Sequence, residues 1–73
     1  MTLNTIQTEH APSAIGPYSQ GILVNNQLFT SGQIGMLPST GELIGDDVKS
    51  QSRQALDNLK AVVEAAGMTL SDV

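Results

Sequence analysis

Two hydroxyl-bearing side chains, Tyr18 and Ser31, stand at glycine- or proline-marked corners on either side of a short apolar segment. Tyr18 follows the rigid Gly16-Pro17 step, and Ser31 precedes Gly32. At the end of a strand, the Ser31 hydroxyl can donate to a ligand oxygen, and Gly32 lets a ligand approach a backbone N–H without a Cβ in the way. A phenol from the opposing loop could reach the same ligand. The three residues Tyr18, Ser31 and Gly32 are therefore candidates for one binding corner.

Each of these residues also has a purely structural interpretation. Ser31 and Gly32 can simply end a strand, and Tyr18 can cover the core with its hydroxyl in water. Residue type and spacing alone do not choose between the two interpretations.

Other site chemistries find little support in the sequence. Ser31 has only His10 as an imidazole partner and no nucleophile-elbow pattern around it, which argues against a serine hydrolase. Since the chain has one histidine, no cysteine and no recognised ligand spacing among its seven carboxylates, we expect no metal site. The glycines match no phosphate-binding loop.

The charge distribution bears on possible partners. The formal net charge is −4, and all three basic residues lie in one segment, Lys49 to Lys60. This pattern argues against a nucleic-acid partner. No stretch approaches the roughly 18 apolar residues that cross a bilayer, and the first ten residues lack the features of a secretory signal. We expect a cytoplasmic protein without a membrane partner.

The chain up to residue 47 predicts short strands separated by loops. Residues 2–8 indicate a strand, and 9–20, interrupted by two prolines and a glycine, indicate a surface loop. Residues 21–24 and 28–31 predict a hairpin, because the intervening Asn25-Asn26-Gln27 tolerates the left-handed backbone of tight turns. A second loop is expected over 33–47.

The remainder of the chain has the periodicity of an amphipathic helix. It starts at Asp46 or Asp47, either of which can cap it, and ends at Gly67. Steps of three and four predict a buried face made of Val48, Ser52, Ala55, Leu56, Leu59, Val62, Val63 and Ala66. The opposite face carries oppositely charged side chains four residues apart and is expected to be solvated.

These elements make an incomplete α+β layer with a thin core. The chain has 73 residues and two aromatic side chains, and no disulfide is possible. Burial in so small a domain barely offsets the ordering entropy. At least one sheet edge is expected to lack a partner strand. We therefore expect association with other copies, or additional chain, to supply further stability.

Four blocks, APSAIGPYSQG, LFTSGQIG, TGE and QALDNLKAVVEAAG, follow one another in an order and spacing that resemble the reactive intermediate deaminase (RidA) family, also called YjgF or L-PSP endoribonuclease. The resemblance covers essentially the whole chain but only the N-terminal half of the family. It implies that residues 1–73 are the N-terminal portion of a single domain with a chorismate-mutase-like α+β fold. It also implies a homotrimer with active sites between subunits.

The family resemblance further implies a cofactor-independent enzyme that hydrolyses reactive enamines and imines, such as 2-aminoacrylate, to 2-keto acids and ammonia. Tyr18 and Ser31 match the family's catalytic residues, and Ser31 and Gly32 match those against the ligand. The family's arginine, which pairs with the substrate carboxylate, and its glutamate, which orients water, lie in the C-terminal half, which has no counterpart here. We therefore expect the 73-residue chain alone to be inactive.

Three functions remain open at this point. The first is the imine deaminase, and the second is a trimeric binding or regulatory protein that holds small keto acids without turnover. The third is the nuclease of the older family name, which ranks last because of the net charge of −4.

Overall fold

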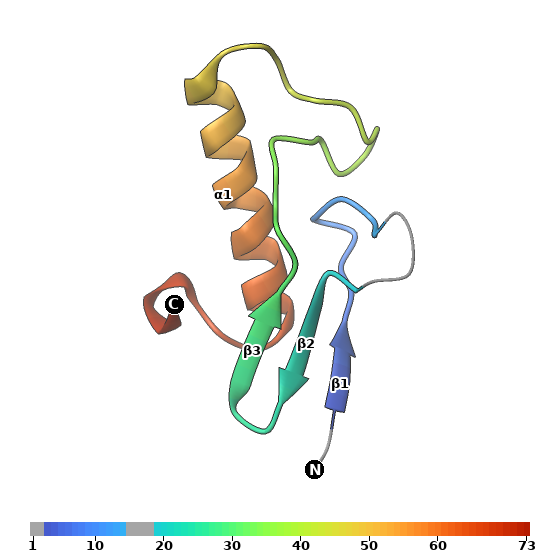
Figure 1. Ribbon diagram of the computed structural model, residues 1–73, viewed down its shortest axis with the longest axis vertical. Helices are drawn as coiled ribbons and strands as arrows, with labels where there is room; N and C mark the ends of the chain where they lie inside the picture. Colours follow the sequence, from blue (N-terminus) through green and yellow to red (C-terminus); the bar gives the residue numbers. More distant parts are fainter. Residues whose placement is uncertain (1–2, 15–18) are drawn as a thin grey trace.

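The structure is a computed structural model that describes residues 3–14 and 19–73, in which one helix packs against one face of a small sheet (Figure 1). The sheet has three antiparallel strands in the order β1-β2-β3. The predicted α+β class is confirmed. The elements in chain order are β1 (Leu3–Ile6), β2 (Gly21–Val24), β3 (Gln27–Thr30), α1 (Val48–Ala65) and the short 3-10 turn η1 (Leu70–Asp72).

The hairpin lies where the sequence predicts it, but its turn is tighter. Gln27 pairs with Val24, so the connection consists of Asn25 and Asn26 alone. Asn25 has a φ of 56°, which two-residue hairpin turns favour. As a result β3 begins one residue earlier than predicted and ends at Thr30, and Ser31 is the first residue beyond it.

The first strand is shorter than the predicted range 2–8. It ends at Ile6, and the backbone N–H of Thr8 donates to the side-chain Oε1 of Gln20 at 2.7 Å. The backbone after Ile6 is thus bound by a side chain and no longer by a neighbouring strand.

The helix has the predicted ends. Asp47 is the N-cap, and its Oδ2 accepts from the Ser50 backbone N–H at 2.8 Å. That hydrogen bond is the main reason the pKa of Asp47 lies below its usual value. At the other end Gly67 follows the C-cap with a φ of 81°, the left-handed conformation that commonly ends helices.

The core lies between the sheet and the C-terminal half of α1. It consists of Ile6, Ala11 and Val62, with Leu23 and Leu28 packed against them. The predicted helix face is wrong at three positions, since Val48 is 80% and Leu56 is 59% exposed and Ser52 is exposed as well. A four-residue strand spans only about 13 Å. An 18-residue helix is about 27 Å long, so the sheet cannot cover the N-terminal half.

A buried asparagine on α1 holds the connection after β3 against the helix. Asn58 is fully buried, and its Nδ2 donates to the carbonyl oxygens of Ile34 and Met36 at 2.9 and 2.8 Å. Its Oδ1 accepts from Gln54 Nε2 at 2.9 Å. The connection that follows β3 is thereby fastened to the helix.

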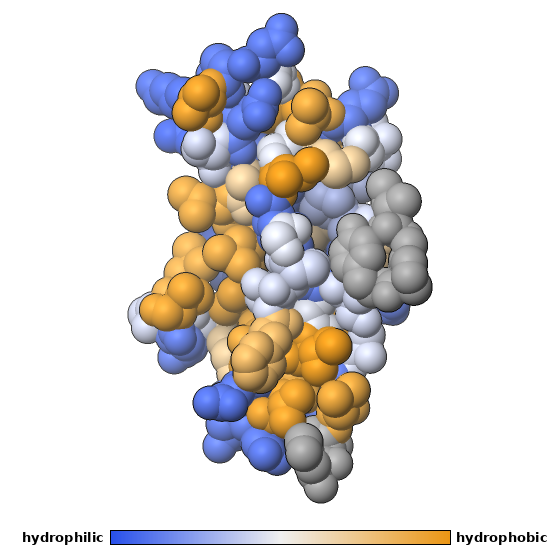
Figure 2. Space-filling view, viewed as in Figure 1, coloured by the Kyte–Doolittle hydropathy of each residue, from blue (hydrophilic) through white to orange (hydrophobic). Residues whose placement is uncertain are grey.

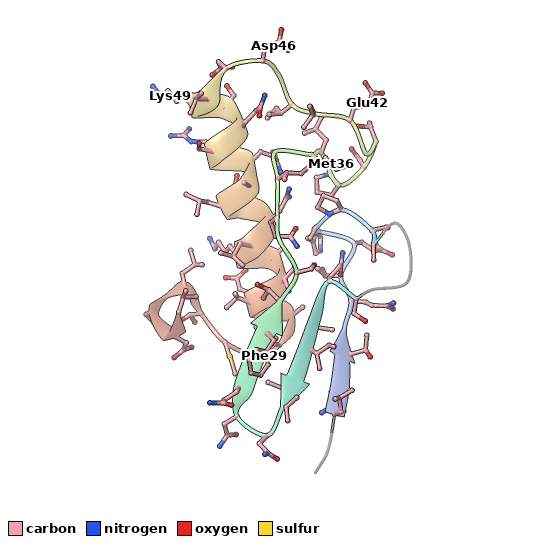
Figure 3. All side chains as sticks on the ribbon, in the orientation of Figure 1. Phe29, Met36, Glu42, Asp46 and Lys49 are labelled. Atoms are coloured by element: carbon pink, nitrogen blue, oxygen red, sulfur yellow. The ribbon has the colours of Figure 1, made fainter. Side chains whose placement is uncertain are left out.

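The connection 31–47 is more ordered than the predicted loop. Met36 and Leu43 form an isolated antiparallel bridge around a turn in which Gly41 has a φ of 75°. Figure 3 shows Met36 and Glu42 in this connection, beyond the ends of the strands.

The sheet face opposite the helix is apolar and open. Cross-strand pairing places Leu3 beside Val24 and Ile22 beside Phe29 on this face, and Leu3 and Phe29 are each 60% exposed. Figure 2 shows the corresponding hydrophobic patch over the strands. Among the described residues, no helix combines the length and apolar character that crossing a bilayer requires.

We predict that Asn58→Ala lowers the free energy of unfolding by about 2–4 kcal/mol, because it leaves two carbonyls without their donor and opens a cavity. Asp57→Ala, at the exposed neighbouring position, should change it by less than about 0.5 kcal/mol. Urea unfolding followed by circular dichroism at equal protein concentration measures both. Equal losses in the two variants would contradict the role given to Asn58.

Candidate functional site

Ser31 and Gly32 line a small hollow of about 120 Å³. Drug-sized ligands occupy pockets of roughly 300–1,000 Å³, so this hollow suits a molecule of only a few heavy atoms. Its walls come from the loop after β1 and from the connection after β3. The lining residues are Pro12, Ser13, Gln20, Ser31, Gly32, Gln33, Ile34 and Met36.

Tyr18, the third predicted site residue, lies outside the described residues. Its convergence with Ser31 and Gly32 therefore stays a prediction. Described residues that precede and follow it in sequence, Ser13 and Gln20, line the hollow.

The Ser31 hydroxyl is already engaged as a donor. Both its backbone N–H and its Oγ lie within hydrogen-bond distance of the Gln20 carbonyl oxygen, at 3.0 and 3.2 Å. Because a carbonyl oxygen carries no proton, the hydroxyl must be the donor in the second bond. From the sequence we expected the Ser31 hydroxyl to donate to a ligand oxygen. In this arrangement Ser31 offers a ligand its lone pairs.

Gly32 is a glycine without a structural need among the described residues. A Cβ at this position would meet no atom of residues 3–14 or 19–73 within 4 Å, and its φ lies outside the left-handed region. Gly35 differs, since a Cβ there would lie 2.8 Å from Gln51 Cα and 2.9 Å from Gln51 O. Gly35 is thus required by packing, whereas Gly32 leaves open space beside the hollow.

The lining carries no charged side chain among the described residues. All three basic residues of the chain belong to α1, and Figure 3 shows Lys49 in its first turn. The hollow can offer a ligand hydrogen-bonding groups, but its described lining offers no cation for a carboxylate.

The predicted site did not include Gln20, which hydrogen-bonds to both walls of the hollow. Gln20 is 4% exposed and bonds through its side chain to the loop after β1 and through its carbonyl to Ser31. Gln20 belongs to the block APSAIGPYSQG that carries the family resemblance, but residue type and spacing drew attention to the Tyr18 phenol in that block and not to its glutamine.

A larger hollow, of about 590 Å³, lies elsewhere and contains none of the predicted site residues. It runs along β3, the edge strand of the described sheet, toward Leu59 and Val63 of α1 and the C-terminal Val73. Its greater size reflects an uncovered sheet edge, so we assign the site to the smaller hollow, where polar groups converge.

Comparison with known proteins places these features in a family context. The family model described as Endoribonuclease L-PSP matches residues 8–73. A RutC family protein of Sulfurisphaera tokodaii is 54% identical over 71 residues, covering 97% of this chain and 57% of that protein. The 2-iminobutanoate/2-iminopropanoate deaminase of Escherichia coli K12 is 56% identical over 69 residues, covering 94% of this chain and 53% of the enzyme.

A solved structure shares the fold. The crystal structure of E. coli TdcF with bound serine superposes with a TM-score of 0.90 at 49% identity, covering 94% of this chain and 54% of that one. The chain thus spans about half the length of the relatives it matches.

Gly32 at the hollow and Gly35, three residues further along the chain, give a matched pair of substitutions. Gly35→Ala should lower the free energy of unfolding by about 1–3 kcal/mol, because its Cβ would overlap the α1 backbone. Gly32→Ala should leave it unchanged or raise it by up to about 1 kcal/mol, since alanine restricts the unfolded chain. Urea unfolding compares the two variants. A destabilised Gly32→Ala variant would show that this glycine serves the fold.

Proposed function

Because this chain belongs to the Endoribonuclease L-PSP (RidA) family, we propose that it forms the N-terminal half of a cytoplasmic enzyme that hydrolyses reactive imines. The substrates are 2-iminopropanoate, the tautomer of 2-aminoacrylate, and its four-carbon homologue. Water adds to the imine carbon, and the resulting carbinolamine expels ammonia and leaves the 2-keto acid. No cofactor takes part, because the reaction involves neither redox change nor group transfer.

One observation carries the proposal: an identity of 56% to a protein named 2-iminobutanoate/2-iminopropanoate deaminase extends over 94% of this chain. The hollow at Ser31 supports it, since its volume of about 120 Å³ suits a three- or four-carbon acid. The open space beside Gly32 supports it further, because a ligand can approach that backbone without displacing any described side chain.

The residue roles follow the family pattern. Tyr18 and Ser31 act on the substrate as catalytic residues, and Ser31 and the Gly32 N–H bind it. A cation for the carboxylate and a carboxylate for the water come from the second half that the relatives carry. The uncharged lining of the hollow agrees with this division, since binding an anion away from water without a partner charge is costly.

The exposed apolar surfaces support a larger assembly. We propose a chorismate-mutase-like domain completed by a second half that covers the edge of β3 and the groove beside it. Three such domains associate through the open sheet face of Leu3, Ile22, Val24 and Phe29, with the sites in the clefts between subunits. Exposed contiguous apolar surface of this kind marks interaction sites.

A second candidate function is a binding or regulatory protein that holds small acids without turnover. The structure of TdcF with bound serine favours it, because TdcF is a relative of this chain that holds a small amino acid. Turnover separates the two functions. A nuclease remains the weakest candidate, because the net charge is −4 and the described lining of the hollow carries no cation.

The activity prediction compares this chain with an extended chain, in which Val73 is joined to the second half of the E. coli deaminase. The extended chain should accelerate deamination of 2-aminoacrylate generated by a dehydratase, and the 73-residue chain should not. Positioning of substrate and water supplies several kcal/mol of barrier reduction, and the short chain lacks the groups that provide it. Ammonia release above the spontaneous rate is the measurement.

Substitutions in the extended chain test the roles. Ser31→Ala and Tyr18→Phe should each lower kcat/KM by at least about tenfold, the effect of losing one hydrogen bond to a charged or reacting group. Ser52→Ala, an exposed serine on α1, is the control. Acceleration by the short chain would mean that the second half is not needed, and the mechanism would have to be abandoned.

For assembly, the extended chain should sediment as a trimer. Phe29→Lys should shift it toward monomers, because it places a charge on the open sheet face, whereas Val48→Lys, at an exposed helix position, should not. Analytical ultracentrifugation over a range of concentrations checks this. A trimer that persists in Phe29→Lys would move the interface elsewhere.

A further inference from the structure

We propose that Gln20 is a positioning residue that fixes both walls of the hollow and makes the Ser31 hydroxyl an acceptor for the nitrogen of the ligand. This inference rests on the proposed function. It gives a role to a residue that the site prediction did not include and assigns a direction to the hydrogen bond at Ser31.

The first wall is held by the Gln20 side chain. Its Oε1 accepts from the Thr8 N–H at 2.7 Å, and its Nε2 lies 2.7 Å from the Pro12 carbonyl oxygen. The carbonyl oxygens of Thr8 and Ala11 lie 3.1 and 3.2 Å from the same nitrogen. Since this stretch of chain belongs to no strand or helix, one amide replaces the hydrogen bonds that regular structure would supply.

The second wall is held by the Gln20 backbone. Its carbonyl oxygen accepts from the N–H and the hydroxyl of Ser31, at 3.0 and 3.2 Å. On the other side, Gln33 Nε2 donates to the Ser31 carbonyl oxygen at 3.3 Å. The position of Ser31 relative to Pro12 and Ser13 is therefore set through a single residue, Gln20.

The direction of these bonds decides what Ser31 can recognise. With its proton directed to Gln20, the Ser31 Oγ presents lone pairs to the hollow, and these accept from an N–H but repel a carbonyl oxygen. An imine, an iminium or a carbinolamine carries an N–H, whereas the keto acid product carries only a carbonyl oxygen at that carbon. Ser31 therefore favours nitrogen-bearing species over the product, which assists product release.

The test uses two stable ligands with the same three-carbon skeleton, L-alanine and pyruvate, bound to the extended chain. Isothermal titration gives the ratio of their dissociation constants, and only changes in this ratio between variants are interpreted, so the different ligand charges cancel. Ser31→Ala should reduce the preference for alanine by about tenfold, as expected for a hydrogen bond to a charged group. Ser31→Thr, which keeps the hydroxyl, should retain the preference.

Gln20→Leu keeps the backbone carbonyl that accepts the Ser31 proton but removes the side-chain bonds that hold this carbonyl in place. The carbonyl should then shift relative to Ser31 and the preference should fall by up to a similar factor, and adding Ser31→Ala should cause little further loss, because both changes act on one hydrogen bond. Gln20→Met, which keeps the unbranched shape and length of the side chain and loses only its amide, is the milder second variant. Gln7→Leu, the same change at an exposed glutamine, should leave the ratio unchanged.

Several results would overturn the inference. An unchanged ratio in Ser31→Ala would do so whether or not the Gln20 variants fold. If the Gln20 variants bind both ligands more weakly by the same factor, Gln20 has only a structural role. Failure of either ligand to bind the unsubstituted extended chain would also contradict the inference. Turnover is a separate readout. A shifted ratio without deamination would defeat the proposed function alone, and deamination with an unchanged ratio would defeat this inference alone.

Discussion

Two buried amide side chains, Gln20 and Asn58, hold together the parts of this chain that are neither strand nor helix. A buried backbone carbonyl without a partner costs about 1–3 kcal/mol, and a core of a few aliphatic side chains cannot absorb several such losses. Asn58 supplies donors to two carbonyls of the connection after β3, and Gln20 lies close to three of the loop after β1. Within the described residues, each of these two irregular segments is bound to one buried amide side chain.

The candidate site depends on this arrangement. Ser31 and Gly32 lie directly after β3, and the chain beyond them is fixed to α1 by Asn58 and by the close approach of Gly35 to Gln51. On the other side, the Gln20 side chain binds the opposing loop, and the Gln20 backbone carbonyl accepts from the Ser31 hydroxyl. The hollow thus lies between two loops that hydrogen bonds of Gln20 connect to each other.

The surfaces left uncovered are consistent with a chain that works within a larger assembly. One sheet face exposes Leu3 and Phe29, and the edge of β3 borders a groove of about 590 Å³ (Figure 2). The described lining of the hollow has no charge, and the basic residues lie on α1. The exposed apolar surface and the absence of a cation in the described lining both agree with the assembly proposed above.

Short-range patterns in the sequence were sufficient to predict the hairpin, the helix with its N-cap Asp47 and with Gly67 at its end, and the α+β class, whereas the convergence of Tyr18 with Ser31 and Gly32 stays a prediction. The confirmed features depend on residues within a few positions of one another. Only the tertiary structure decided that Val48 and Leu56 are exposed. The periodicity of a helix predicts which side chains share a face, but it does not predict how much of that face the sheet is long enough to cover. The same holds for the hydrogen bonds of Asn58 to residues 22 and 24 positions away and for the bond that directs the Ser31 proton to Gln20, 11 positions away. Such contacts join residues brought together by folding, and a polar side chain that forms them has the same local sequence signal as one exposed to water.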